Sequence, residues 1–261
     1  MNISFIGFGR MAQAIAKGLS SSKEYAMQAA SPSLALGINP QGVRTCSDNK
    51  QVITHADILI LAVKPAQMSA VLTEINHLLH PKIVMISIAA GLTLRWLNRL
   101  CPDKAIVRAM PNIAAALGQS ATPLIANAKV TEEQQMWVEH LFKCLGLITW
   151  VTQESNMNVF TALSGSGPAY VFLFMDSMIK TAMSLGISEE IAHLFALQTF
   201  QGALCLATEN KSTIEDLIKQ VTSPAGTTAA ALGVFMHHGL KDIVHEAMAA
   251  ATKRAKELSL I

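Results

Sequence analysis

The sequence predicts an α/β protein with a doubly wound sheet in its first half and helices alone in its second half. Short apolar runs rich in Ile and Val alternate with helical patterns up to Val151, as in a sheet covered by helices. The first run leads directly into a GxGxxA turn, which opens a helix in Rossmann-type folds. After Val151 only helical patterns follow. We therefore expect an N-terminal Rossmann-type domain at residues 1–152 and an all-helical C-terminal domain at residues 153–261.

The strands are expected where apolar residues run continuously, because a strand buried on both faces of a parallel sheet does not alternate. Strong runs lie at residues 3–6, 58–63, 83–88 and 105–109, and weaker ones lie at 27–30, 122–125 and 147–151. Helical spacing between these runs predicts helices at residues 10–19, 66–79 and 93–100.

The second half predicts a set of apolar helices. Residues 169–185 are apolar almost all round and end at Gly186, which indicates a buried helix. Further helices are expected at 188–208, from a capping box at Ser212–Glu215 to Gln220, at 228–238 and at 241–258. The last helix aligns Ile243, Val244, Ala247, Met248, Ala251 and Leu258 on one stripe. Such helices predict packing between subunits, with a single intramolecular bundle as the alternative.

Composition excludes several classes of protein. The chain has 261 residues, of which 51% are hydrophobic and 15% charged, and its net charge is +2. That charge offers no basic field for nucleic acid. The longest stretch without a charged residue, 155–175, is interrupted by Asn, Ser, Gly and Pro, so we expect no membrane span. A strand from residue 2 with no basic segment ahead of it predicts no targeting segment and a soluble, cytoplasmic protein.

The four cysteines, Cys46, Cys101, Cys144 and Cys205, are scattered. They form no CxxC motif and have no neighbouring His. We therefore expect neither a metal site nor a disulfide, and we interpret all four as buried thiols in a reducing compartment.

The glycine turn predicts a dinucleotide site. Gly7 permits the tight turn after the first strand, Gly9 lets the backbone approach a pyrophosphate, and Ala12 allows close packing of helix on strand. The helix N-terminus then faces the phosphate charge. The alternative interpretation is a glycine-rich structural turn, which the following βαβ pattern disfavours.

The end of the second strand indicates which dinucleotide binds. NAD sites usually place an acid there to grip the ribose 2′-hydroxyl, but no acid occurs between Glu24 and Asp48. Ser31 and Ser33 could donate hydrogen bonds to a 2′-phosphate, although no Arg stands beside them. NADPH is therefore the expected cofactor, with NADH also accepted.

Loops after two further strands are candidate cofactor contacts. Ala62-Val63-Lys64-Pro65 and Ala89-Ala90-Gly91 end strands at the carboxyl edge, where ligands bind in open α/β sheets. The strand-end position favours a ligand contact for Lys64 over a solvated surface lysine.

Two uncharged loops in the second half predict an anionic substrate. Ser164–Tyr170 and Thr222–Thr228 are rich in Gly, Pro and hydroxyl residues, and each stands before a helix. Backbone N–H groups at a helix N-terminus, together with hydroxyls, form an anion site without a cation. The alternative is that both are capping and packing turns.

These motifs together resemble the pyrroline-5-carboxylate reductases, which catalyse the last step of proline biosynthesis. The resemblance covers essentially the whole chain, and its most specific parts are "RAMPN" (108–112), "TALSGSGPAY" (161–170) and "VTSPAGTT" (221–228). It implies a Rossmann domain that binds NAD(P) and a helical domain that binds substrate and forms an intertwined homodimer. A higher oligomer is left open.

The resemblance also implies individual site residues. Cofactor contacts fall on Ile6, Gly7, Phe8, Gly9, Arg10, Met11, Ser31, Pro32, Asn49, Val63, Lys64 and Ala90, with Ala62 and Pro65 beside them. Substrate contacts fall on Glu154, Ser223, Thr227 and Thr228, with the backbone of Gly226 added from the helix-terminus argument. Gln220 stands where some relatives have Asn, and Ala225 stands where the family often has Gly. Some relatives carry an Arg near the end of the second strand, which this chain lacks.

The hypothesis is that NADPH delivers hydride to C5 of the cyclic imine of pyrroline-5-carboxylate, giving L-proline. The signature loops contain no His or Cys, and a protonated imine needs little acid–base help, so positioning carries most of the catalysis. N–H groups near Gly226–Thr228 and the Ser223 hydroxyl would hold the carboxylate, and the Thr228 hydroxyl would orient the ring nitrogen. Residues 110–112 and 164–168 would wall the nicotinamide.

Two rival functions remain. One is another imine or β-hydroxyacid reductase; hydroxyacid relatives carry a catalytic Lys on the long helix, where this chain has only Lys180, about three turns in. The other is a non-catalytic NADP-binding sensor, which should lack a substrate-holding anion loop.

Overall fold

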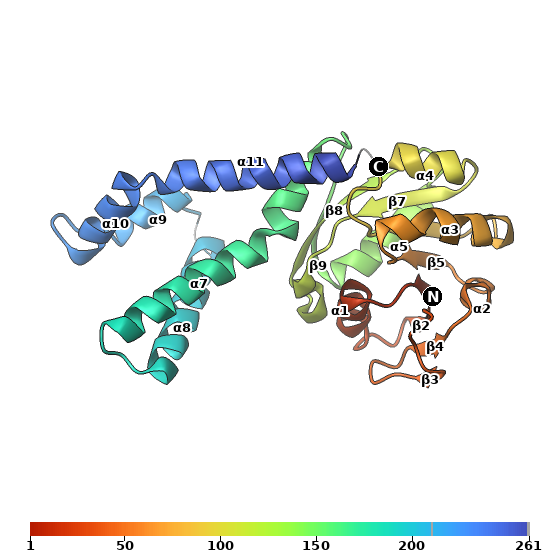
Figure 1. Ribbon diagram of the computed structural model, residues 1–261, viewed down its shortest axis with the longest axis horizontal. Helices are drawn as coiled ribbons and strands as arrows, with labels where there is room; N and C mark the ends of the chain where they lie inside the picture. The colour runs from red at the N-terminus through yellow and green to blue at the C-terminus, as the bar shows by residue number, and fades with distance from the viewer. Residues whose placement is uncertain (210, 260–261) are drawn as a thin grey trace. The chain divides into compact units, whose positions relative to one another are not determined.

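The computed structural model describes residues 1–209 and 211–259 and forms two compact units. Unit 1 comprises Met1–Ser166 together with the segment that begins at Ala250, and unit 2 is Gly167–Ala249. Figure 1 shows the sheet with its helices in the first unit and long helices alone in the second. The expected end of the helical domain, at residue 261, lies outside the described residues.

Unit 1 is built on one mixed sheet. Its described strands run in the order β3-β4-β2-β1-β5-β6-β7-β8-β9. Their bounds are β1 (Asn2–Ile6), β2 (Ala26–Ala30), β3 (Gly37–Ile38), β4 (Arg44–Cys46), β5 (Ile58–Leu61), β6 (Val84–Ser87), β7 (Ala105–Ala109), β8 (Ser120–Ala126) and β9 (Gly146–Trp150). The β3–β4 and β7–β8 pairs are antiparallel and the others are parallel. The chain leaves β1 toward β2 on one side and returns with β5 on the other, so the switch point where α/β sheets bind ligands lies between β1 and β5.

Helices cover both faces of this sheet (Figure 1). The helical segments are α1 (Arg10–Leu19), α2 (Asn49–Ile53), α3 (Pro65–Ile75), α4 (Leu94–Leu100) and α5 (Glu132–Lys143), with 3-10 turns η1 (Asn76–Leu78) and η2 (Ile113–Leu117). Under α1 and α5, Ile15 and Phe142 share a buried cluster with Phe5 of β1. On the other face, Leu72 of α3 and Leu97 of α4 pack with Leu59 of β5 in a second cluster. The strands are therefore apolar on both sides, as their continuous runs predict.

The segment that leaves the sheet is helical, which corrects the prediction of a loop at Ser164–Tyr170. After α6 (Asn156–Phe160) the chain continues as a π-helical turn, η3 (Thr161–Gly165), and then as α7 (Gly167–Ser184). The N–H of Ser166 donates to the carbonyl oxygen of Thr161 at 2.8 Å, and the Ser164 hydroxyl donates to the carbonyl oxygen of Phe160 at 3.0 Å. Hydroxyls that bond backward in this way often bend a helix, and here the bond lies in the π-helical turn.

Unit 2 contains α7, α8 (Glu189–Glu209), α9 (Ile214–Gln220), α10 (Thr227–His237) and the first part of α11 (Leu240–Leu258). α7 and α8 lie side by side (Figure 1). The prediction that residues 169–185 form a buried helix is wrong for the isolated chain, because Phe172 and Leu173 are 61% and 68% exposed. A helix that is apolar all round needs cover on every side, and the neighbouring helices of this chain supply it only in part.

By length and composition α8 could cross a membrane, alone among the described helices. One such helix is weak evidence for a membrane span, since helices that pack inside proteins pass the same test.

The cysteines differ from the prediction: Cys46 and Cys101 are buried, whereas Cys144 and Cys205 are exposed, and all four are free thiols.

Candidate cofactor and substrate sites

The β1–α1 turn is closed tightly against the end of β5. Gly7 has φ +82°, and a Cβ there would lie 2.8 Å from the carbonyl carbon of Ala62 and the nitrogen of Val63. Its own N–H donates to the carbonyl oxygen of Ala30 at 2.9 Å. Only glycine tolerates this positive φ and also fits where there is no room for a Cβ. The turn thus brings three predicted cofactor residues, Gly7, Ala62 and Val63, together at the switch point.

The start of α1 is open toward solvent and fits a pyrophosphate. Gly9 is the N-cap of α1, and a Cβ placed on it would have no atom within 4 Å. Gly9 brings no side chain to cap the helix, so first-turn N–H groups can face a ligand. Ala12 is buried against the sheet, and Arg10, at the first helical position, is exposed. The residues present at this turn therefore fit a dinucleotide phosphate.

The end of β2 presents hydroxyls where an NAD site would place an acid. Ser31 donates its N–H to the carbonyl oxygen of Cys46 at 3.1 Å, which ties the end of β2 to the end of β4. The hydroxyls of Ser31 and Ser33 lie 3.2 Å apart. Arg44 pairs with Gln28, further back along β2. The end of β2 is therefore compatible with a 2′-phosphate that is bound by the hydroxyls of Ser31 and Ser33.

Asn49 and Lys64 each lie at the start of a helix that follows a strand, α2 after β4 and α3 after β5. Asn49 begins α2, and its side-chain NH₂ donates to Glu74 Oε2 at 2.9 Å, so the amide oxygen is the group left for a cofactor. Lys64 is the exposed N-cap of α3, with Pro65 at the first helical position. An N-cap lysine leaves the first-turn N–H groups uncapped and adds a positive charge beside them.

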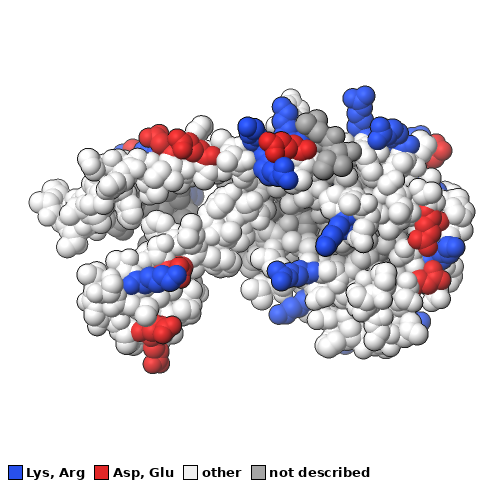
Figure 2. Space-filling model, in the orientation of Figure 1, with Lys and Arg blue, Asp and Glu red and all other residues white. Residues whose placement is uncertain are grey.

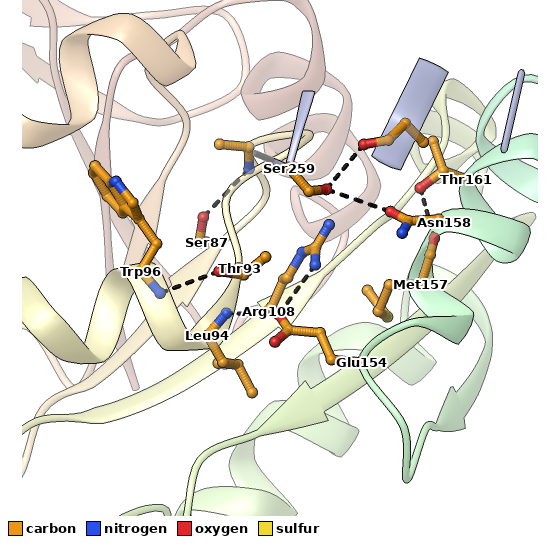
Figure 3. Close-up of polar contacts among 12 residues, drawn as sticks. Ser87, Thr93, Leu94, Trp96, Arg108, Glu154, Met157, Asn158, Thr161 and Ser259 are labelled. Carbon is orange, nitrogen blue, oxygen red and sulfur yellow. Dashed lines mark hydrogen bonds and ion pairs between the residues drawn. The ribbon is translucent and has the colours of Figure 1, made fainter. Parts of the chain in front are cut away.

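The buried Arg108 forms an ion pair with the half-buried Glu154, which no local pattern in the sequence predicts. Figure 3 shows Arg108, Glu154 and Leu94 pointing toward one another. Arg108, in β7, is 3% exposed and donates from Nη1 to Glu154 Oε1 at 3.1 Å. The same oxygen accepts the N–H of Leu94, the first residue of α4, at 2.6 Å. Glu154 thus joins β7 to the N-terminus of α4. Its predicted substrate contact would have to coexist with these bonds.

Asn112 of the "RAMPN" motif ties the end of β7 to the π-helical turn. Its side-chain NH₂ donates to the carbonyl oxygen of Ser164 at 2.9 Å, and its Oδ1 accepts the N–H of Ala114 at 3.0 Å. Its own N–H donates to the Ser120 hydroxyl at 3.0 Å. Met110 packs beside Gly165, where an added Cβ would meet the Met110 Cε at 3.4 Å. The two segments predicted to wall the nicotinamide are therefore held together by direct contacts.

The "VTSPAGTT" segment forms a strained turn between α9 and α10. Ala225 has φ +57°, and it is the one non-glycine residue with positive φ in the part of the chain that the structure describes. Gly226 is the N-cap of α10, and its N–H donates to the carbonyl oxygen of Ser223 at 3.1 Å. A Cβ on Gly226 would overlap the Ser223 Oγ, so the hydroxyl folds directly over this glycine. Thr227 and Thr228 supply the first-turn N–H groups.

Unit 2 thus holds Gln220, Ser223, Gly226, Thr227 and Thr228 on one turn and its flanking helix ends, whereas Glu154 belongs to unit 1. Figure 2 shows few charged side chains over α7 to α10. An N-terminus of α10 lined by hydroxyls is an anion site that needs no cation.

Comparison with known proteins gives the family. Residues 154–258 match the family described as pyrroline-5-carboxylate reductase dimerisation, and residues 2–91 match the one described as NADP oxidoreductase, coenzyme F420-dependent. Pyrroline-5-carboxylate reductase of Vibrio alginolyticus is 39% identical over 98% of this chain and 97% of its own.

Two solved structures are similar over nearly the whole chain. The pyrroline-5-carboxylate reductase of Coxiella burnetii is 37% identical, with a TM-score of 0.88 and coverage of 99% of this chain and 98% of that one. The Plasmodium falciparum pyrroline carboxylate reductase with NADP bound is 29% identical, with a TM-score of 0.92 and the same coverage. The chain therefore belongs to the pyrroline-5-carboxylate reductase family.

Proposed function

We propose that this protein reduces 1-pyrroline-5-carboxylate to L-proline, with NADPH as the preferred donor and NADH as a second one. The observation that carries the proposal is the full-length similarity to pyrroline-5-carboxylate reductases at up to 39% identity. The chain keeps both a dinucleotide turn and an uncharged anion turn. A non-catalytic NADP sensor would need only the first of these.

The predicted cofactor residues bind different parts of the dinucleotide. The first-turn N–H groups of α1 receive the pyrophosphate, Ser31 and Ser33 receive the 2′-phosphate, and Val63, Lys64 and Ala90 line the remaining edge. The bound cofactor supplies the hydride that reduces C5 of the imine. Hydroxyl donors without a carboxylate nearby admit a phosphorylated ribose, because no negative charge repels it.

The substrate residues hold a zwitterion by its negative end. The N–H groups of Thr227 and Thr228 and the Ser223 hydroxyl bind the carboxylate, and the Thr228 hydroxyl orients the ring nitrogen. Gly226 contributes as the N-cap of α10, because its own N–H donates to the carbonyl oxygen of Ser223. Fixed lysines or arginines would repel the neighbouring iminium, whereas N–H groups and hydroxyls attract the carboxylate alone. Catalysis then rests on positioning, with Thr228 as the residue nearest the reacting bond.

We also propose the division of labour along the chain. Residues 1–152 bind the cofactor, and residues 153–261 bind substrate and form a homodimer through the C-terminal helices. The match of residues 154–258 to a dimerisation family supports the second part. We assign the protein to the cytoplasm, with a small-molecule substrate and no nucleic-acid or membrane partner.

The test follows NADPH absorbance with purified protein and pyrroline-5-carboxylate, and repeats the assay with NADH. The expected result is oxidation of NADPH with formation of proline, and a lower kcat/KM for NADH. Absence of turnover with both donors would overturn the proposal. Tight NADPH binding without turnover of any cyclic imine would instead favour the sensor function.

A further inference from the structure

We propose that the last turn of α11 is a positioning element of the cofactor site, which packs on the loop Ala89–Gly91 and holds it in shape for NADPH. The inference rests on the proposed function only in naming the cofactor. The loop follows β6 at the carboxyl edge of the sheet, and it contains Ala90, a predicted cofactor contact. The turn of α11 that reaches it belongs to the same unit as the sheet.

The contact is made by backbone against backbone. Gly91 has φ +84°, and a Cβ there would lie 2.6 Å from the carbonyl oxygen of Leu258 and 2.9 Å from its Cβ. Any side chain at position 91 would have to push the helix end away from the loop. Gly91 is therefore needed both for its dihedral angle and for the approach of α11.

One face of the helix end is docked and the other is solvated. Ala255 is 8% exposed, and Leu258 and Ser259 are half-buried. These residues are three and four positions apart, so they share one face of the helix. Lys256 and Glu257, on the same turn, are exposed. The Ser259 hydroxyl lies 3.4 Å from Asn158 Oδ1 and donates to the carbonyl oxygen of Ala255 at 2.9 Å (Figure 3).

The residues that follow the loop are fixed by separate contacts. Leu92 is buried, and Leu94 donates its N–H to Glu154, which Arg108 also binds. Ala90 therefore lies between the end of β6 on one side and Gly91, which the helix end contacts, on the other. Loosening the helix end would free Ala90 while leaving the sheet and the glycine turn intact.

The test compares two glutamine substitutions on the docked turn in the full-length protein. Ala255→Gln adds bulk to the buried face, and Lys256→Gln is the matched control on the exposed face. We expect Ala255→Gln to weaken NADPH binding by about ten-fold in calorimetric titration and to speed amide hydrogen exchange of residues 88–93 in the cofactor-free protein. Lys256→Gln should leave both measurements unchanged.

Kinetics separate positioning from general destabilisation. The KM for NADPH should rise with Ala255→Gln, while kcat at saturating NADPH stays within about two-fold, and the conservative Ala255→Ser should restore the wild-type value. If Ala255→Gln does not fold, Leu258→Gly loosens the same contact at a half-exposed site. An unchanged NADPH Kd, or faster exchange spread over all the strands, would overturn the inference. The NADPH Kd and the hydrogen exchange need no turnover, so these two measurements remain decisive even if the wild-type protein reduces no imine.

Discussion

In the substrate turn, the Ser223 hydroxyl packs against Gly226, where a side chain would leave it no room. The Ser223 Oγ occupies the space that any side chain at position 226 would need, and Ala225 bends the backbone through φ +57° to bring the two together. An alanine held in the left-handed region costs about 1 kcal/mol or more. Such strain is typical of sites where the surrounding structure fixes a conformation for function, which agrees with the role proposed for this turn.

Removing the Thr228 hydroxyl should impair catalysis without affecting cofactor binding. We expect Thr228→Ala to lower kcat/KM for pyrroline-5-carboxylate by about ten-fold or more, because a hydrogen bond made in the transition state is lost. The NADPH Kd should not change. Steady-state kinetics together with calorimetric titration check both statements.

The control for Thr228 lies in the same turn. Thr222 donates its hydroxyl to the carbonyl oxygen of Ile218, so Thr222→Ala removes a hydroxyl of equal size from outside the proposed site and should leave kcat/KM close to wild type. Thr228→Ser, which keeps the hydroxyl, should recover most of the activity. Wild-type kinetics for Thr228→Ala would show that the residue is assigned the wrong role.

Gly226→Ala tests the packing of the turn. The backbone at residue 226 has φ −79°, so alanine is not strained there. The main effect is displacement of the Ser223 hydroxyl, with a smaller one from the Ser223 carbonyl oxygen, 3.1 Å from the added Cβ. We expect the KM for the imine to rise by about ten-fold, as for loss of a hydrogen bond to a charged group. The double variant Gly226→Ala, Ser223→Ala should be no worse than Ser223→Ala alone; an additive loss would contradict the shared-space explanation.

The two buried cysteines differ from the exposed ones in reactivity. Burial raises the pKa of the Cys101 thiol to about 11, and the thiolate is the reactive form. At pH 8 a thiol-specific disulfide reagent should modify Cys144 quickly and Cys101 only on unfolding. Reaction rates for Cys144→Ser and Cys101→Ser variants check this: the first should lose a fast phase and the second should not.

The Cys101 thiol should also make stability depend on pH. Because the folded protein favours the protonated thiol, the contribution of Cys101 to the free energy of unfolding should be lost as the pH rises from about 9 to about 11.

At the scale of elements, the buried strands could be predicted and the surface elements could not. Continuous apolar runs predict β1, β5, β6 and β7 because burial on both faces favours apolar residues at nearly every position. The buried exceptions in these strands are Ser4, Ser87 and Arg108. The short β3 and β4 carry no such run: β3 is the edge strand, with both residues exposed, and β4 beside it has only three residues. α5 begins with a full capping box between Thr131 and Gln134, a local signal by which the sequence predicts a helix start at this position.

Long-range polar partners are the part of the site that spacing cannot predict. Glu154 and Arg108 are 46 positions apart, and nothing local in the sequence pairs them. The glycines behave differently, because they recur in recognisable motifs. Gly226 is required by Ser223, three positions away, and Gly7 belongs to the GxGxxA turn although the atoms that leave no room for a Cβ there belong to the distant Ala62 and Val63. Resemblance therefore suggested Glu154 as a substrate contact, whereas its bonds in the structure go to Arg108 and Leu94.

The Arg108–Glu154 pair should stabilise unit 1 strongly. Removing Glu154 leaves a guanidinium that is 3% exposed without its carboxylate, so we expect Glu154→Ala to cost about 3 kcal/mol of unfolding free energy. Urea unfolding measures the loss. Asp176→Ala, which breaks the exposed Lys180–Asp176 pair of α7, should cost less than about 0.5 kcal/mol. Equal losses for the two variants would show that burial of the pair is not what matters.

At the scale of the whole molecule, unit 2 exposes more apolar surface than a monomer in water tolerates. The exposed large side chains on α7 and α8 include Phe172, Leu173, Leu194, Phe195 and Leu204. Figure 2 shows few charges over these helices. A second copy of the same helices would cover such a face, and the chain's match to a dimerisation family lies in this region. The exposed face thus favours packing between subunits over the alternative of a single intramolecular bundle.

A charge on this face should therefore dissociate the dimer. Phe195 is 70% exposed in the chain, and Phe195→Glu would place a carboxylate in an apolar interface, where an unpaired charge costs several kcal/mol. We expect the wild type to sediment as a dimer or larger and its unfolding temperature to rise with protein concentration, and the variant to sediment as a monomer. Met136, 62% exposed on α5 of unit 1, is the matched control, and Met136→Glu should leave assembly intact. Because α8 belongs to the same unit as the substrate turn, loss of assembly should also lower imine reduction; a fully active monomer would mean that the helices pack for stability alone and that each chain carries a complete site.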